Sequence, residues 1–325
     1  MKPQGETTCG RVVAVERNLY QVDTPLGRIG CRPRGRIARA ARSAQGGRTT
    51  APVVVGDRVQ VRPAAEPGGR GVIEAVLPRA TTVSRRATGP IPKEQILAAN
   101  IDVAVAIVSL RQPRLKLGTV SQFVAGARSG GAEPAIVVNK VDLGPPGEAA
   151  AALGPFRDAG VRCVETSAVR GCGLDELREL LAGRWSLFYG QSGVGKSSLL
   201  NALCPEAAAR VGEVSADGNK GRHTTTSSRL YELPGGGYVI DTPGIKAFWF
   251  CAAPVQDELD ELFPEIAGLA DGCRFRDCSH GPEPDCAVVA ALEAGEIDEA
   301  RYKHYVRLAR SARRREAAAA KVKRR

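Results

Sequence analysis

The sequence predicts a multidomain protein with a small N-terminal β barrel, a central α/β domain on a parallel sheet, and a mostly helical C-terminal region. Up to about Arg79, short β-branched runs alternate with glycine-rich turns, which is typical of a small barrel. From about Gln95, nearly continuous apolar strands, the first expected at Asp102–Ser109, alternate with helical stretches, which indicates a parallel sheet covered on both faces. After about Val255 a Cys/His cluster and basic helical sequence follow. We therefore expect domains at residues 1–80, 81–254 and 255–325.

The predicted barrel strands lie in four runs: GRVVAVERNLYQV, LGRIGCRPRG, PVVVGDRVQV and GRGVIEAVLPR. Between the second and third runs, residues 38–51 are polar, basic and glycine-bearing, so we predict a mobile loop between barrel strands. A small β sandwich without a ligand would give the same periodicity, and the pattern alone leaves that alternative open.

Composition limits the partners and the compartment. The chain has 325 residues and a formal net charge of +11, so nucleic acid is the first candidate partner, with a membrane surface or simple solubility as alternatives. No stretch approaches the roughly 18 apolar residues of a membrane helix, and the N-terminus lacks the apolar core of a secretory signal. Nine cysteines with a single close cluster are unlike the framework of a small secreted domain. We therefore expect a cytoplasmic protein with no membrane partner.

The strongest local motif is GQSGVGKS, which follows the expected strand Trp185–Tyr189 and precedes a helical run. Strand, glycine-rich loop and helix in this order form a phosphate-binding loop, in which backbone N–H groups and the positive end of the helix face the phosphates. Lys196 is expected to reach the β and γ phosphates and Ser197 to hold Mg²⁺. The expected nucleotide contacts are Gly190, Gln191, Ser192, Gly193, Val194, Gly195, Lys196, Ser197 and Ser198.

Two further motifs select the base. The first, NKVD, follows the expected strand Ala135–Val138, and the second, TSA, follows the expected strand Val161–Glu165. The first resembles the guanine-specificity motif of GTPases, whose aspartate accepts bonds from the guanine N1–H and 2-amino groups; adenine lacks this donor pair. The second resembles the motif whose backbone supports the base. A simple helix cap is the alternative interpretation of the first motif alone. The expected base contacts are Asn139, Lys140, Val141 and Asp142 from the first motif, and Ser167 and Ala168 from the second.

The remaining motifs lie around the expected strand Tyr238–Asp241. Asp241 and Gly244 belong to DTPG, which resembles the motif whose aspartate holds Mg²⁺ through water and whose glycine N–H meets the γ phosphate. GRHTTTS resembles the first switch, which supplies a threonine to the metal; we favour Thr225, and Thr224 is the alternative.

The residue after DTPG bears on catalysis. Many GTPases place a water-orienting glutamine there, and this chain has Ile245, which cannot form a hydrogen bond. His223 in the first switch is therefore the candidate catalytic residue, and an ordinary surface histidine is the alternative.

The order of the motifs is permuted. Ordinary GTPases run phosphate loop, switch threonine, DxxG, NKxD and Ser-Ala, whereas here the last two precede the phosphate loop. A circular permutation keeps the sheet and the site while cutting the chain elsewhere. The cut follows DTPG, so the second switch leads directly into the C-terminal region. We therefore expect the presence of the γ phosphate to reposition that region.

Four potential metal ligands lie close together in the C-terminal region: Cys273, Cys278, His280 and Cys286. Three thiolates and one imidazole form the ligand set of a closed structural zinc site, which leaves no position for a substrate water. We therefore predict one structural Zn²⁺ per chain, with reduced core cysteines beside an incidental histidine as the alternative. The remaining cysteines are expected to be ordinary small apolar residues: Cys9, Cys31, Cys163, Cys172, Cys204 and Cys251.

Together these features resemble the ribosome-small-subunit-dependent GTPase A family over nearly the whole chain. The resemblance rests on PVVVGDRV, EQILAANIDVAVAIVS, NKVDL, GQSGVGKSSLLNAL, GRHTTT, DTPGI and the Cys/His spacing. It implies an oligonucleotide-binding-type (OB-type) barrel, a circularly permuted P-loop GTPase domain, zinc in the tail, and a late role in maturation of the small ribosomal subunit.

The resemblance also implies partners: GTP and GDP with Mg²⁺, and the small ribosomal subunit with its rRNA. We expect a monomer that the subunit stimulates. Aromatic residues make up 5% of the chain, which favours structured rRNA over stacking on single strands as the main mode. A P-loop kinase or ATPase and a non-catalytic RNA-binding scaffold are the alternative functions. Arginines crowd one barrel segment and suit phosphate contacts, with a solvated surface as the alternative: Arg32, Arg34, Arg36, Arg39, Arg42 and Arg48.

Overall fold

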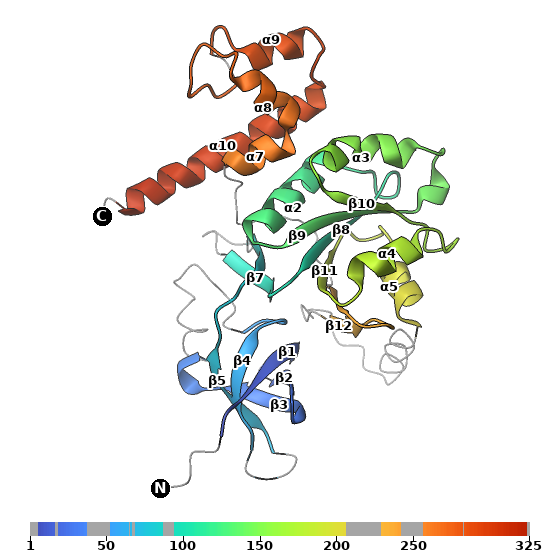
Figure 1. Ribbon diagram of the computed structural model, residues 1–325, viewed down its shortest axis with the longest axis vertical. Helices are drawn as coiled ribbons and strands as arrows, with labels where there is room; N and C mark the ends of the chain where they lie inside the picture. The colour runs from blue at the N-terminus through green and yellow to red at the C-terminus, as the bar shows by residue number, and fades with distance from the viewer. Residues whose placement is uncertain are drawn as a thin grey trace.

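The computed structural model describes three parts that follow one another along the chain. It covers residues 6–16, 19–37, 53–64, 66, 69–86, 94–205, 229–241, 256–281 and 283–323. In Figure 1 the N-terminal barrel lies below, the central sheet in the middle and the C-terminal helices above. The predicted fold class is confirmed, while the domain boundaries at residues 80 and 254 stay predictions.

The N-terminal part is a closed barrel with the strand order β1-β2-β3-β5-β4. Pairing is antiparallel except between β3 and β5, and the β1–β4 pair closes the barrel. Val12, Val22, Val59 and Ile73 are fully buried, as inward-facing residues of a small barrel are. The barrel prediction is confirmed, and the predicted loop at residues 38–51 lies outside the described residues. The strands are β1 (Thr8–Glu16), β2 (Leu19–Thr24), β3 (Gly27–Pro33), β4 (Arg58–Arg62) and β5 (Gly71–Val76).

The central part is a six-stranded sheet with the order β10-β9-β8-β11-β13-β12. All neighbours are parallel except the edge strand β12, which is antiparallel to β13. The five strands expected from apolar runs are confirmed, whereas β12 and the hairpin of β6 (Thr82–Arg86) and β7 (Glu94–Ala99) were not predicted. The strands are β8 (Val103–Ser109), β9 (Glu133–Asn139), β10 (Arg162–Glu165), β11 (Trp185–Tyr189), β12 (Arg229–Glu232) and β13 (Tyr238–Asp241).

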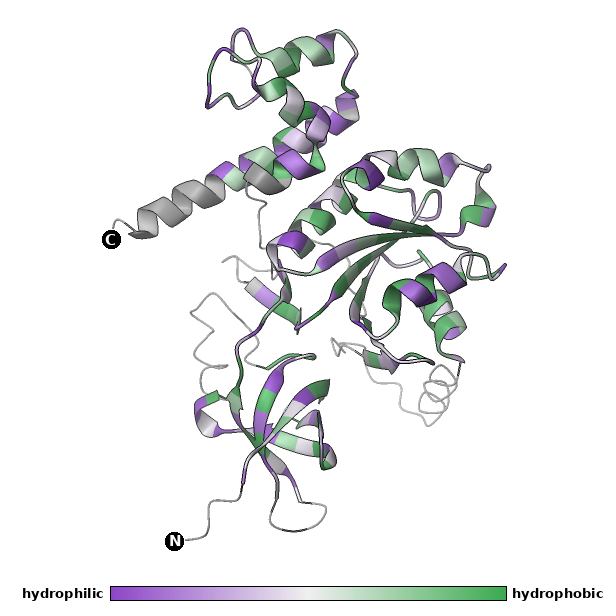
Figure 2. Ribbon diagram, in the orientation of Figure 1, coloured by the Kyte–Doolittle hydropathy of each residue, from purple (hydrophilic) through white to green (hydrophobic). Residues whose placement is uncertain are grey.

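Helices cover both faces of the sheet. α2 (Leu117–Ser129) and α3 (Glu148–Asp158) pack on one face, and α4 (Leu174–Leu181) and α5 (Lys196–Leu203) on the other. Along β8, Ala104 and Ala106 face the first helix layer while Val103, Val105 and Ile107 face the second. Burial on both faces explains why β8 shows no polar alternation. The strongly hydrophobic central strands are green in Figure 2.

The C-terminal part packs on the central part through α2. Its described residues include α7 (Gln256–Leu262), α8 (Pro264–Ala270), α9 (Ala287–Glu293) and α10 (Glu299–Lys323), and α7 and α10 contact α2. Buried Leu259, Leu262 and Phe263 belong to the same core cluster as Phe123 of α2. None of the helices in the described ranges combines the length and the apolarity that crossing a membrane requires.

Arg11 joins the barrel to the central sheet. Its guanidinium lies 3.4 Å from the centre of the Trp185 ring and donates to the carbonyls of Gly56 and Asn100. Burial lowers the pKa of Arg11 to about 10, against the opposing effect of Asp102, so the group stays charged at neutral pH. Since Trp185 begins β11 and the phosphate loop follows β11, a single strand connects this contact to the loop.

Candidate functional site

The predicted nucleotide motifs meet at one edge of the central sheet, where the parallel strands have their carboxyl ends. Asn139 ends β9, Ser167 follows β10, Gly190 follows β11 and Asp241 ends β13. These strands lie side by side with β8 between β9 and β11. Ligands of open α/β sheets bind outside the carboxyl ends of the strands. The sheet therefore gathers motifs that are far apart in the sequence.

The phosphate loop has a backbone that requires glycine. Gly193 and Gly195 have φ angles of 88° and 95°, in the left-handed region that other residues avoid. A Cβ atom at Gly195 would lie 2.2 Å from Nδ2 of Asn139, so the loop approaches the base motif too closely for a side chain. Lys196 begins α5, and its Nζ donates to the carbonyl of Gly190 at 3.1 Å. A cation at a helix N-terminus favours an anion at this loop.

Asn139 connects the two base motifs to the phosphate loop. Its Nδ2 donates to the carbonyl of Val194 at 3.0 Å. Its Oδ1 accepts from the backbone N–H of Ala168 at 3.1 Å and from the hydroxyl of Thr166 at 3.3 Å. The residue is 1% exposed, so both ends of the amide have partners away from water, as a buried polar group requires. One side chain thus joins segments that the permutation has reordered.

Lys140 and Asp142 flank the place expected for the base. Lys140 has a left-handed backbone, and its Nζ donates to the carbonyls of Gln112 at 2.9 Å and Gly193 at 2.5 Å. Oδ1 of Asp142 accepts from the hydroxyl of Ser167 at 2.5 Å. This bond is the largest of the effects that lower the pKa of the Asp142 carboxyl. Asp142 is therefore ionised at neutral pH and accepts hydrogen bonds from N–H donors.

Asp241 and Ser197 lie at the same sheet edge. Asp241 is paired in register with Phe188, two residues before the phosphate loop, and is 8% exposed. Ser197 lies in the first turn of α5. Carboxylate and hydroxyl oxygens suit Mg²⁺, so these two residues fit its coordination chemistry. The other predicted residues of this region lie outside the described residues: His223, Thr224, Thr225, Gly244 and Ile245.

Two residues contribute to the site although the motifs assigned them no contact. Thr166 is fully buried, and its carbonyl accepts from the backbone N–H of Val141 at 3.2 Å. Gln112 supplies a carbonyl to Lys140. Thr166 opens the Thr-Ser-Ala motif, so its position carried a signal. No sequence motif indicated Gln112, because its contact with Lys140 depends on how the segment after β8 folds back.

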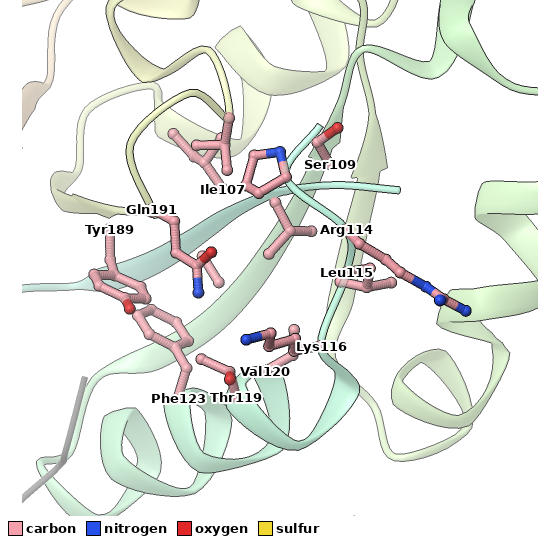
Figure 3. A pocket seen from close by; sticks show the side chains of 15 residues that line it. Ile107, Ser109, Arg114, Leu115, Lys116, Thr119, Val120, Phe123, Tyr189 and Gln191 are labelled. Carbon is pink, nitrogen blue, oxygen red and sulfur yellow. The ribbon is translucent and has the colours of Figure 1, made fainter. Parts of the chain in front are cut away.

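A small, partly open hollow lies beside the phosphate loop, between the end of β8 and the start of α2 (Figure 3). Gln191 lines it together with the stacked rings of Phe123 and Tyr189, whose centroids are 5.4 Å apart. Burial raises the pKa of Tyr189. The lining of the hollow includes no base-motif residue and neither Lys196 nor Ser197. Gly190, Gln191 and Val194 of the phosphate loop do line it, so the hollow adjoins the predicted nucleotide contacts.

The predicted metal ligands come together between α8 and α9. The ligand atoms of Cys273, Cys278, His280 and Cys286 all lie within 4.8 Å of one another. The Cys273 and Cys286 sulfurs are 3.8 Å apart, and Nδ1 of His280 lies 3.5 and 3.7 Å from them. Zinc bonds of about 2.3 Å to sulfur and about 2.0 Å to nitrogen, in tetrahedral geometry, require about 3.8 Å between two sulfurs and about 3.5 Å between sulfur and nitrogen. The atoms of Cys273, His280 and Cys286 therefore have the separations of a zinc site, and all four ligand atoms lie close enough together to hold one ion.

The other cysteines divide by burial. Cys31, Cys163 and Cys204 are buried, and burial raises the pKa of Cys31 and Cys163 to about 11, as for inert apolar residues. Cys9 and Cys172 are exposed, and neither belongs to the cluster of four potential metal ligands. Cys251 lies outside the described residues.

Glu74 partly neutralises the arginine-rich segment of the barrel. Arg34 and Arg62 both form ion pairs with its carboxylate, and Arg36 donates to its carbonyl at 3.3 Å. Arg32 is exposed, whereas positions 39, 42 and 48 lie outside the described residues. This face is therefore less positive than the sequence indicates, and phosphate contacts there stay a prediction.

Comparison with known proteins agrees with this geometry. The sequence profile of the family described as RsgA GTPase matches residues 76–250. The small ribosomal subunit biogenesis GTPase RsgA of Chlorobaculum parvum is 40% identical over 310 residues, which cover 93% of this chain and 97% of that protein. The structure of YjeQ from Thermotoga maritima aligns with a TM-score of 0.64 and 31% identity, over 94% of this chain and 99% of its own. YloQ, a circularly permuted GTPase, aligns with a TM-score of 0.62 and 27% identity, over 97% and 98%.

Proposed function

Because the chain belongs to the RsgA GTPase family and is a GTP hydrolase, we propose that it binds the small ribosomal subunit late in maturation and hydrolyses GTP there. Relatives that match most of the chain are named small ribosomal subunit biogenesis GTPases. The observation that carries the nucleotide part of the proposal is the bonding of Asn139 to both Val194 and Ala168. It supports a single guanine-nucleotide site assembled from permuted motifs.

Each motif has one role in the proposed site. The Asp142 carboxylate accepts hydrogen bonds from the guanine N1–H and 2-amino groups, and the remaining residues of the two base motifs surround the ring. The backbone of residues 190–198 and the Lys196 ammonium bind the phosphates, and Gly244 meets the γ phosphate. Ser197, Thr225 and, through water, Asp241 would hold Mg²⁺, which supplies positive charge against the phosphates.

We also propose that the Cys/His cluster holds one structural Zn²⁺ per chain. Its separations support this assignment. Four protein ligands close the coordination sphere, so the metal would contribute folding free energy and no catalysis.

The proposed partner is the rRNA of the small subunit. A net charge of +11 suits a polyanion, and binding to it should weaken steeply with salt. We expect the protein to act as a monomer in the cytoplasm, where the subunits mature, and without a membrane partner.

The proposed hydrolysis step depends on the subunit. Ile245 cannot orient a water, so His223 is proposed to do so when RNA contacts order the first switch. Ordering the switch costs conformational entropy, which a large partner offsets. Turnover by the protein alone should therefore be slow.

The test measures GTP turnover with and without purified small subunits, for wild type, His223→Ala and the matched control His304→Gln. We expect large stimulation of wild type and control, and loss of stimulation in His223→Ala with its GDP affinity retained. Equal stimulation of all three would remove His223 from the mechanism. A wild type that the subunit does not stimulate contradicts the ribosome-dependent proposal itself.

A further inference from the structure

Phe275, in the Cys/His loop, is an aromatic ring that the fold leaves in water. It is 41% exposed, whereas Phe123, Phe156, Phe188 and Phe263 are at most 2% exposed. An exposed ring forgoes the free energy that burial would supply. A single exposed apolar residue is ordinary on a protein surface, so its meaning depends on the neighbours.

Two arginines flank this ring. The guanidinium of Arg274 lies 5.6 Å from the ring centre and forms an ion pair with Asp285 at 2.9 Å. Arg276 is exposed and forms no ion pair with any other residue in the described part of the chain. The exposed ring thus has an arginine on each side of it in the sequence, and Arg274 also lies near its face.

The loop that carries the ring is held at both ends. The backbone N–H of Cys273 donates to the carbonyl of Ala270 at 3.1 Å, and that of Cys278 to the carbonyl of Phe275 at 3.2 Å. Arg313 of α10 donates to the carbonyl of Cys278 at 2.7 Å. A ring on a fixed loop loses little freedom when a flat partner stacks on it.

We propose that Phe275 is a stacking platform for an unpaired RNA base, with Arg274 and Arg276 contacting the neighbouring phosphates. Every base has a π face and every nucleotide a phosphate, so an exposed ring with an arginine before and after it in the sequence matches one unpaired nucleotide. The net charge of +11 favours RNA over a protein surface as the partner. The inference rests on the proposed function, which supplies small-subunit rRNA as the RNA, and it adds a local base contact to recognition by shape and charge.

The test uses the full-length protein with two probes. One is purified small subunits, and the other is a single-stranded RNA of about 12 nucleotides, compared with its duplex. Phe275→Ala and Phe275→Leu should weaken single-strand binding roughly tenfold, while Phe275→Trp retains it and duplex binding changes little. Arg276→Gln should reduce the dependence of log K on log salt by about one ion. Subunit binding should weaken in the same order.

The outcomes separate this inference from the proposed function. If Phe275→Leu binds as tightly as wild type, the contact is merely apolar and the platform is wrong. Equal single-strand binding by Phe275→Ala and wild type also overturns it. A wild type that binds the oligonucleotide and not the subunit instead contradicts the proposed function. Zinc content is measured throughout; if Phe275→Ala loses metal, the comparison of Phe275→Leu with Phe275→Trp decides.

Discussion

The nucleotide site and the Cys/His cluster are assembled in opposite ways. The nucleotide site joins residues distant in sequence, such as Asn139 and Val194, on strands and helices that are packed in two apolar layers. The ligands of the cluster come from one short segment, Cys273 to Cys286, between α8 and α9. Core packing therefore positions the first set of side chains, whereas a bound metal would position the second.

This difference explains how a permuted chain keeps its site. Side chains at the sheet edge depend on which strands are neighbours, and β9, β8, β11 and β13 are neighbours whatever the chain order. Removing the nucleotide should therefore leave the sheet edge intact. Losing zinc should dismantle the other region.

The largest expected effect follows from removing zinc. Structural zinc supplies about 10–16 kcal/mol in small finger peptides, so Cys278→Ala or chelation should unfold the segment around the cluster. GDP affinity should persist, because the nucleotide motifs precede this segment. Limited proteolysis and a GDP titration measure both, with Cys31→Ala as a control outside the cluster. Zinc loss with unchanged protease sensitivity would show that the metal does not hold this region.

A smaller effect is expected from Asp142→Asn. The amide presents an N–H in place of an acceptor, so the variant should prefer xanthine, whose C2 carbonyl replaces the 2-amino donor. The change in preference between GTP and XTP should be on the order of 10⁴-fold. Competition binding measures it, and Asp175→Asn on the exposed face of α4 is the matched control. A variant that keeps the wild-type preference for GTP would place the base elsewhere.

The smallest effect concerns Ser167→Ala and appears only at acid pH. The Ser167 hydroxyl lowers the pKa of Asp142, so the wild-type carboxylate stays ionised as the pH falls. Without that donor the pKa rises, protonation begins at a higher pH, and the acceptor for guanine is lost sooner. The ratio of variant to wild-type GDP dissociation constants should therefore increase from pH 7 toward pH 4. A ratio that is constant with pH would mean that this hydrogen bond does not tune Asp142.

The sequence predicted the parallel strands because their apolar runs are buried on both faces. It did not predict β12 or the β6–β7 hairpin, whose short strands mix charged and apolar residues, as in RLYE and TVSRR. Such strands form because a neighbouring strand supplies hydrogen-bonding partners, and the local sequence does not indicate which strand that is.

The site shows the same limit at the level of side chains. Motif spacing placed Asn139, Ser167 and Lys196 at the sheet edge, since each follows a strand. It did not predict that Asn139 reaches Val194 or that Lys140 reaches Gln112, because those contacts depend on how separate loops pack. The ion pair between Glu74 and Arg34 could not be predicted from the sequence for the same reason.

Thermal unfolding of the wild-type protein with GDP or ADP tests the central claim most directly, that the permuted motifs form one guanine-nucleotide site. At about 100 times its dissociation constant, a ligand of the folded state adds about 2.7 kcal/mol. For a domain of this size that raises the midpoint by roughly 5–10 °C. GDP with Mg²⁺ should produce such a shift, and the same concentration of ADP should produce none. Equal shifts with both nucleotides would contradict the base-reading role of Asp142 and with it the assembled site.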